Sequence, residues 1–297
     1  MTILDLHLHS YFSNDADFSP KELVELCLDA GISHAALTDH NSVKGIDPAL
    51  AAAVGKPIEI IPAIEMDCVY RGTILHLLGY GIDHTVPIFD AIEEDVHQQE
   101  QENSSLLIQK VRQLGVEFDD EVVAGLAFDG VITGEMIAEA ALIYDHRGKN
   151  PLLDPYRGDG ERSDNSYVNF YWDYCSQRKP AYTPMRFMSL SQAIEIIQAN
   201  HGVTVLAHPG INVKESPAFL QKIIDEGIQG IEVYTSYHNR QQSAFYREAA
   251  LSNRLLITCG SDFHGKTKKR IKIGGVDCQE GEKRLLDELI SAIEGQR

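Results

Sequence analysis

The chain has 297 residues, of which 43% are hydrophobic, and a formal net charge of −18 at pH 7. A chain of this length and apolar content can bury one large core, as an α/β barrel does. The negative charge argues against non-specific binding to a long nucleic-acid duplex. Its five cysteines, at unrelated spacings, form neither a disulfide framework nor a CxxC zinc site, which favours a reducing, cytoplasmic setting.

The start of the chain has no basic segment leading into an apolar one, so we expect no secretory signal. No apolar run approaches the roughly 18 residues of a spanning helix. We therefore expect a cytoplasmic protein that makes no contact with a membrane.

Residues 1–80 show the alternation of strands and helices that is typical of a parallel sheet. Ser19 and Glu22 form a capping box with Pro20 at the first helical position, so a helix should run to about Ala30. Further predicted elements are a strand at 34–38, a helix at 49–54 and strands at 59–64 and 73–80.

The alternation stops between residues 86 and 181, where the pattern becomes helical. Residues 93–102 and 106–114 predict one long helix, followed by shorter helices at 118–126 and 133–142 and turn-rich loops at 145–151 and 154–160. We expect residues 86–181 to be a mostly helical insertion that caps the substrate site, and residues 1–85 and 182–297 to form the barrel.

The alternation resumes with a second capping box, from Ser189 to Gln192, which begins a helix that ends near Asn200. Predicted strands at 203–207, 231–234 and 255–258 are separated by helices at 217–226 and 240–252, and a helix at 285–293 closes the chain. The fold class is therefore α/β.

Residues of metal-binding type lie in or directly after several of the predicted strands. Side chains two residues apart on a strand share a face, so His7 with His9, and Asp262 with His264, should each point into one cavity. The carboxyl ends of barrel strands form the catalytic face, and imidazole with carboxylate suits divalent Zn, Mn or Fe. We expect a shared metal site made from His7, His9, His40, Glu65, His76, His208, Asp262 and His264.

Four ordered motifs resemble those of the PHP (polymerase and histidinol phosphatase) superfamily: His7-Leu-His9-Ser10, Thr38-Asp-His40, Ala207-His-Pro209 and Gly260-Ser-Asp-Phe-His264. The long insertion and the segment 182–190 after it resemble the TrpH-like phosphoesterase branch, with Met185 where those relatives tend to carry a histidine. The resemblance implies a distorted (β/α)7 TIM-like barrel with a trinuclear metal site.

The resemblance also implies three ligand sets. His7, His9, Glu65 and Asp262 would hold one ion, and Glu65 would bridge to a second ion held by His76 and His208. Asp15, His40 and His264 would hold a third, with Asn14 or Asp17 as the alternative to Asp15. The ions would be Mn, or else Zn or Fe.

The implied reaction is phosphoester hydrolysis by a hydroxide that bridges two ions. Three divalent ions with Asp15, Glu65 and Asp262 leave the cavity at about +3, which suits a phosphate. Asp39 either orients a metal ligand from behind, assisting catalysis, or caps the end of its strand.

Basic residues on an otherwise acidic chain suggest how a small anionic substrate is bound. Arg186 could clamp a second phosphate in a bidentate manner. His238 could contact phosphate or donate a proton to the leaving oxygen. Lys266, Arg178 and Lys179 are the other candidate substrate contacts.

We therefore expect a phosphohydrolase that acts on a nucleotide-type monoester, such as a nucleoside 3′,5′-bisphosphate or the 5′ end of short RNA. The alternatives are a histidinol-phosphate phosphatase, an amidohydrolase-type C–N hydrolase, and a barrel that binds metal without catalysis. The sequence carries no signal for the oligomeric state.

Overall fold

The computed structural model describes residues 3–279 and 281–297. Within them, seven strands form a nearly closed, barrel-like sheet, which confirms the predicted fold class. In sheet order they are β1 (Leu4–Leu8), β2 (His34–Leu37), β3 (Glu59–Tyr70), β4 (Thr73–Tyr80), β6 (Val203–Leu206), β7 (Gly230–Thr235) and β8 (Leu256–Gly260). A parallel bridge between Leu8 and Phe263 brings the first and last strands together.

Strand β4 departs from the parallel order expected from the sequence. It pairs antiparallel with both β3 and β6, and Asp67 lies opposite His76. Strand β3 runs six residues beyond the predicted end at Ile64, to Tyr70, and turns back through Arg71 and Gly72, both with positive φ. His76 therefore reaches the site from the middle of a returning strand.

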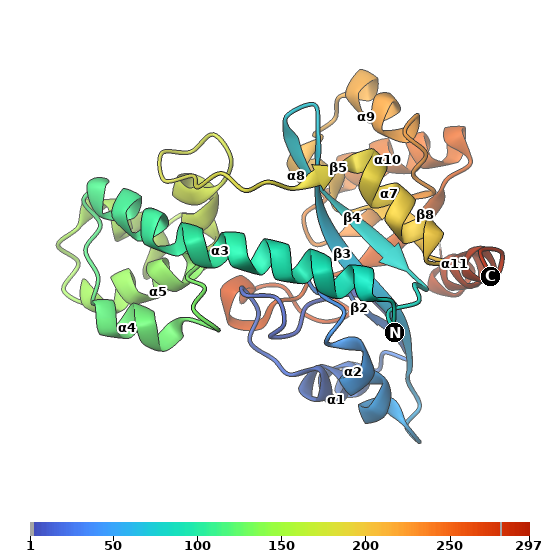
Figure 1. Cartoon of the computed structure of the whole chain (residues 1–297), viewed down its shortest axis with the longest axis horizontal. Coiled ribbons are helices and arrows are strands. Elements are labelled where there is room, and N and C mark those ends of the chain that lie inside the picture. The colour runs from blue at the N-terminus through green and yellow to red at the C-terminus, as the bar shows by residue number, and fades with distance from the viewer. Residues whose placement is uncertain (1–2, 280) are drawn as a thin grey trace.

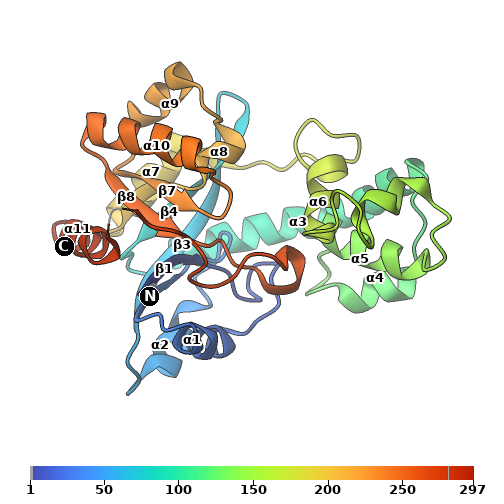
Figure 2. The ribbon, with the colours of Figure 1, turned by 180° about the vertical axis from the view of Figure 1, so that it is seen from behind.

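Helices cover the outside of the barrel, in line with the predicted alternation (Figures 1 and 2). They are α1 (Pro20–Asp29), α2 (Ile46–Ala53), α7 (Leu190–Ala199), α9 (Pro217–Ile224), α10 (Arg240–Asn253) and α11 (Glu282–Glu294). The two predicted capping boxes are present at Ser19 and Ser189. Between these elements lie the short strand β5 (Met188–Ser189), the single turn α8 (Pro209–Asn212) and the 3-10 helix η3 (Gly265–Lys268).

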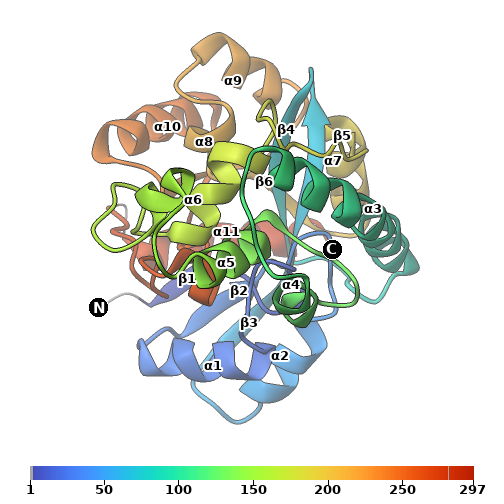
Figure 3. The same ribbon diagram turned by 90° about the vertical axis from the view of Figure 1, so that its left-hand side faces the viewer.

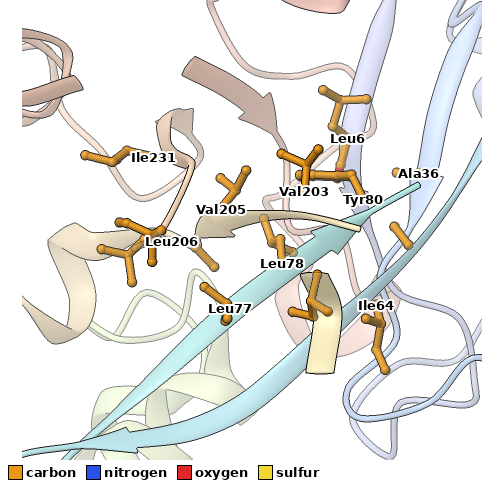
Figure 4. Close-up of a cluster of buried hydrophobic side chains, with 14 of the residues drawn as sticks. Leu6, Ala36, Ile64, Leu77, Leu78, Tyr80, Val203, Val205, Leu206 and Ile231 are labelled. Atoms are coloured by element: carbon orange, nitrogen blue, oxygen red, sulfur yellow. The ribbon is translucent and has the colours of Figure 1, made fainter. Parts of the chain in front are cut away.

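The main hydrophobic core fills the barrel and the layer between the sheet and its helices (Figure 4). Leu6, Ile64 and Val205 are fully buried in it. Tyr80 is buried as well, and its hydroxyl donates to the Leu6 carbonyl at 2.9 Å, which satisfies the one polar atom of that side chain. The core fixes the strands whose ends carry the site.

The segment between β4 and β5 forms a helical lobe with its own core. Helix α3 (Pro87–Gln113) is continuous, as predicted, and extends away from the barrel (Figure 1). It is followed by α4 (Asp120–Leu126), α5 (Gly134–Tyr144), η1 (Pro151–Tyr156), α6 (Ser166–Phe170) and η2 (Tyr171–Cys175). The short helices η1, α6 and η2 were not predicted. Seen from the lobe side, α5 and α6 lie in front of the barrel strands (Figure 3).

A separate cluster, which includes Val111, Ile137 and Phe170, holds these helices together. Within the described ranges, no helix is both long enough and apolar enough to cross a membrane.

Candidate metal centre

Glu65 lies at the centre of the predicted ligand cluster. It is fully buried at the point where β3 passes the end of β2. Its Oε2 lies 3.2 Å from the Nε2 of His7, the Nε2 of His9 and the Nδ1 of His40. Its Oε1 lies 3.1 Å from the Nδ1 of His76 and from the Nε2 of His208. One carboxylate therefore faces two groups of histidines.

Asp262 joins the first of these groups from the loop after β8. Its Oδ1 lies 3.2 Å from the Nε2 of His7 and 3.0 Å from the Nε2 of His9. The ligand atoms of His7, His9, Glu65 and Asp262 all lie within 4.8 Å of one another, as do those of Glu65, His76 and His208. The structure thus brings together the residues predicted for two of the three ions.

The donor atoms of this cluster fit a metal. Among the described residues, six of its buried atoms have no hydrogen-bond partner, the Nδ1 of His208 and five others, and buried polar atoms are nearly always satisfied. The five others are the Nε2 of His7 and of His9, the Nδ1 of His40, the Oε2 of Glu65 and the Oδ1 of Asp262. Divalent ions between these five atoms would satisfy them together.

The third predicted ligand set is partly assembled, with His40 and His264 together and Asp15 close to His264. His9, His40 and His264 offer ligand atoms within 4.8 Å of one another, and the Oδ2 of Asp15 lies 3.3 Å from the Nε2 of His264. The two alternatives to Asp15 point elsewhere: the Asn14 amide donates to Glu100, and Asp17 accepts from the Lys266 backbone. The geometry favours Asp15.

Asp67 is a further potential ligand that the sequence reasoning missed. Its Oδ1 lies 3.3 Å from the Nε2 of His76, and it groups with His40 and His76. The signal was available, because Asp67 is two residues after Glu65 and so shares its face of β3.

A second layer of carboxylates and hydroxyls holds the histidines in place. The Oγ of Ser13 lies 3.0 Å from the Nδ1 of His9 and donates to Asp39 at 2.9 Å. Asp39 also accepts from the backbone and the hydroxyl of Ser10, both at 2.7 Å. Burial raises the pKa of Asp39 to about 6, although His9 and the serine hydrogen bonds oppose that rise. Asp39 therefore acts on His9 through Ser13.

Asp262 has two less expected contacts, one from Lys268 in the loop after β8 and one from Tyr237 in the loop after β7. The Nζ of Lys268, a buried residue, lies 2.7 Å from the Oδ2 of Asp262, and the Tyr237 hydroxyl donates to the same oxygen at 2.5 Å. Burial alone would raise the pKa of Asp262, but the charges of Lys268 and His264 bring it well below its usual range. Lys268 is thus part of the site, although it was not singled out from the sequence.

Two ligand positions have unusual backbone. His208 and Asp262 have φ values of 25° and 58°, in the left-handed region that side chains rarely occupy. Such strain persists only where the surrounding structure enforces it, and it concentrates at functional sites.

A cavity of about 1680 Å³ adjoins the cluster. Asp15, His40, His76, His208 and Asp262 line it from the barrel. The helical lobe contributes Glu100, Glu135, Trp172, Arg178 and Lys179. The cavity lies between the barrel and the lobe.

The structure places two of the five predicted substrate contacts at the cavity and three away from it. Arg178 and Lys179 line the cavity, whereas Arg186, Lys266 and His238 are not among its lining residues. Arg186 is exposed, and Lys266 pairs with Glu139 at 2.9 Å. The ring nitrogens of His238 lie 2.9 Å from the Val233 carbonyl and the Gly210 amide. His238 thus has backbone partners at both nitrogens and stacks on Tyr246, which gives no support to a role in catalysis.

Three curated relatives match most of the chain. A 3′,5′-nucleoside bisphosphate phosphatase of Chromobacterium violaceum is 28% identical, over 89% of this chain and 88% of its own length. A phosphoribosyl 1,2-cyclic phosphate 1,2-diphosphodiesterase of Eggerthella lenta is 25% identical, over 89% and 95%. A 5′-3′ exoribonuclease of Haemophilus influenzae is 28% identical, over 88% and 89%.

A solved structure from Bifidobacterium adolescentis, described as a metal-dependent phosphoesterase, shares the fold with a TM-score of 0.78 at 22% identity, over 98% of this chain and 96% of that one. With the barrel, the buried ligand cluster and these relatives together, the protein is a metal-dependent hydrolase of the phosphoesterase class. Residues 5–136 match the PHP domain, which confirms the resemblance to PHP proteins noted in the sequence.

Proposed function

We propose that this protein hydrolyses a phosphate ester of a nucleotide, either a nucleoside 3′,5′-bisphosphate or the 5′ end of a short RNA. One observation carries the proposal: buried, partnerless nitrogen and oxygen atoms converge at the wall of a cavity that also holds Arg178 and Lys179. The names of the Chromobacterium violaceum and Haemophilus influenzae relatives favour these two substrates.

The metal requirement is part of the proposal. His7, His9, Glu65 and Asp262 would hold one ion, Glu65, His76 and His208 a second, and Asp15, His40 and His264 a third. We infer manganese, with zinc or iron as alternatives, because histidine and carboxylate together accept all three. When bound, the ions supply Lewis acidity and a water of lowered pKa.

The chain's own residues would then bind and orient the substrate. Arg178 and Lys179 reach the cavity from the lobe and suit a second phosphate, and Asp39 and Ser13 keep His9 oriented. Residues 86–181 would serve as the cap that excludes water from the substrate, over a barrel of residues 1–85 and 182–297. The irregular cysteine pattern supports a reducing, cytoplasmic location for this activity.

The decisive experiment measures phosphate release from adenosine 3′,5′-bisphosphate by the manganese-loaded protein. We expect turnover by the wild type and a loss of at least 100-fold in kcat for Asp262→Asn and His9→Ala, because each removes a ligand. Arg178→Ala should raise KM, and Arg186→Ala, which removes an exposed arginine outside the cavity, is the matched control. Failure of the fully metallated wild type to release phosphate from any nucleotide would refute the proposal.

The same assay separates the alternatives. Faster turnover of histidinol phosphate than of the bisphosphate would favour a histidinol-phosphate phosphatase. Two or fewer bound ions, with no affinity for phosphate, would favour an amidohydrolase. Metal content by mass spectrometry and the anomalous scattering of crystals give the number and identity of the ions.

A further inference from the structure

A second cavity, of about 640 Å³, lies beside the first. Trp172, Tyr237 and Lys268 line both cavities, so the two meet at these side chains. We call the second cavity the basic groove. Its walls include Arg162, Asp164, Asn165 and Asn169 from the lobe and Ser236, Arg270, Lys272 and Gly275 from the barrel loops.

The charge of the basic groove contrasts with that of the whole protein. Four of its lining residues are cationic (Arg162, Lys268, Arg270 and Lys272), and Asp164 is the one acidic residue that lines it among the described residues, in a chain with a net charge of −18. Arg162 and Lys268 are paired with Asp173 and Asp262. Arg270 and Lys272 are exposed and, in the part of the chain that the structure describes, have no carboxylate partner. Their charges are available to an anionic ligand.

The two walls of the groove are fixed to one another. Helix α6 of the lobe packs against η3 of the barrel, and the two lie side by side in Figure 2. The backbone N–H of Arg270 donates to the Oδ1 of Asn165 at 3.0 Å, across the junction. The groove is therefore a built feature of the interface rather than a gap between loosely joined parts.

Aromatic rings mark the junction of the groove with the metal centre. The ring centroids of Trp172 and Tyr237 are 6.4 Å apart, and the Tyr237 hydroxyl donates to the ligand Asp262. Aromatic side chains beside a basic track are the combination that binds single-stranded nucleic acid, because every base offers a flat face for stacking.

We propose that the basic groove binds the sugar–phosphate backbone of a single-stranded oligonucleotide whose terminal phosphate lies at the metal centre. Arg270 and Lys272 contact the phosphates that follow, and Trp172 and Tyr237 stack on a base at the junction. This inference rests on the proposed function and extends it, because a groove leading away from the metal centre accommodates a chain longer than a mononucleotide.

The test compares a 5′-phosphorylated tetra-adenylate with adenosine 3′,5′-bisphosphate as substrates of the manganese-loaded protein. Relative to the bisphosphate, we expect KM for the tetranucleotide to rise about tenfold in Arg270→Glu/Lys272→Glu. The double variant Lys21→Glu/Lys283→Glu changes the net charge equally on exposed outer helices and is the control, with neither KM altered. The proposal would be overturned if the ratio of KM for the tetranucleotide to KM for the bisphosphate were the same in the groove variant and in the control.

Direct binding provides a readout that does not depend on turnover. The probe is a 3′-fluorescent tetra-adenylate with a 5′-phosphate and phosphorothioate linkages, followed by anisotropy at several salt concentrations. Each lost phosphate contact lowers the slope of log Kd against log salt by about 0.7, so the groove variant should fall below the wild type by about 1.4. Identical slopes in the groove variant and the wild type would refute the proposal that the groove binds the oligonucleotide. If binding shows the expected difference but no nucleotide is hydrolysed, oligonucleotide binding in the groove is supported and the proposed reaction is refuted.

Discussion

The Oε1 of Glu232, in the middle of β7, lies 2.9 Å from the Nδ1 of His7 on β1, and both side chains are fully buried. Its other oxygen accepts the backbone N–H of His208 at 2.8 Å. A carboxylate at Nδ1 fixes the imidazole tautomer, so that the Nε2 of His7 presents a lone pair to Glu65 and Asp262. A Cβ at Gly260 would come within 2.9 Å of the Oε1 of Glu232, so a glycine at this position leaves room for the contact between Glu232 and His7.

Replacing Glu232 with glutamine should weaken metal binding without unfolding the protein. The amide keeps the size of the side chain but removes the charge that holds His7 in its ligating tautomer. Loss of such an outer partner lowers metal affinity about 10- to 100-fold. Competition with a chelator measures the change, and Glu59→Gln, at the distant start of β3, is the control. Unchanged affinity would show that Glu232 only fills space.

Lys268 and Asp262 should be strongly coupled in the metal-free protein. Lys268→Met leaves a buried carboxylate oxygen without its cation, and breaking a buried pair from one side costs about 3 kcal/mol of unfolding free energy. The double variant Asp262→Asn/Lys268→Met removes both charges and should recover most of that loss. Urea denaturation of the two single variants and the double variant in EDTA measures the coupling. If the losses of unfolding free energy in the two single variants were additive, the contact at 2.7 Å between Lys268 and Asp262 would contribute no coupling energy.

Features that depend on the local residue pattern were predicted correctly from the sequence. Both capping boxes, the long helix α3 and the strand-end positions of His7, His40 and His208 follow from residue spacing along a single element. The ligand cluster was predictable because side chains at the ends of parallel strands meet at one face of the barrel. The antiparallel direction of β4 could not be predicted. Residues 59–80 resemble one interrupted apolar run, and the turn at Arg71 and Gly72 lies within it.

The supporting residues were missed for a different reason. Glu232 lies inside an apolar strand, and Lys268 lies in a basic run that also carries exposed residues. Their roles depend on which residues of distant strands and loops face them, and no single-element pattern records that. His238 shows the converse, since it follows its strand as the proposed metal ligands do but bonds to the backbone at both nitrogens.

Glu100 should make the metal-free protein less stable as the pH rises. Burial, followed by repulsion from Asp67 and Asp15, raises its pKa to about 8, against the hydrogen bond from Asn14. Because the folded state then holds a proton that the unfolded state releases near pH 4.5, stability falls between about pH 4.5 and 8.

Glu100→Gln keeps an acceptor for Asn14 but removes this titration. In EDTA at pH 8 we expect the variant to be more stable than the wild type by at least the roughly 1.4 kcal/mol of one pKa unit. At pH 4 the two should be equal, since Glu100 is protonated in both states of the wild type. Denaturation at a series of pH values provides the comparison. A constant difference between the two proteins across that range would contradict the assignment.

Metal binding should itself stabilise the fold. Without ions, the partnerless atoms of His7, His9 and Glu65 are buried at a cost, and ligands that bind only the folded state add RT ln(1 + [L]/Kd) to its stability. At a free manganese concentration of 100 times Kd, that gain is about 2.7 kcal/mol for one site. Calorimetry with and without manganese should show a rise in Tm for the wild type. His9→Ala should reduce the rise, because His9 belongs to two of the ligand groups, whereas His34→Ala, at a partly exposed position at the start of β2, should leave it intact. An equal rise in both variants would place the stabilising ion outside this cluster.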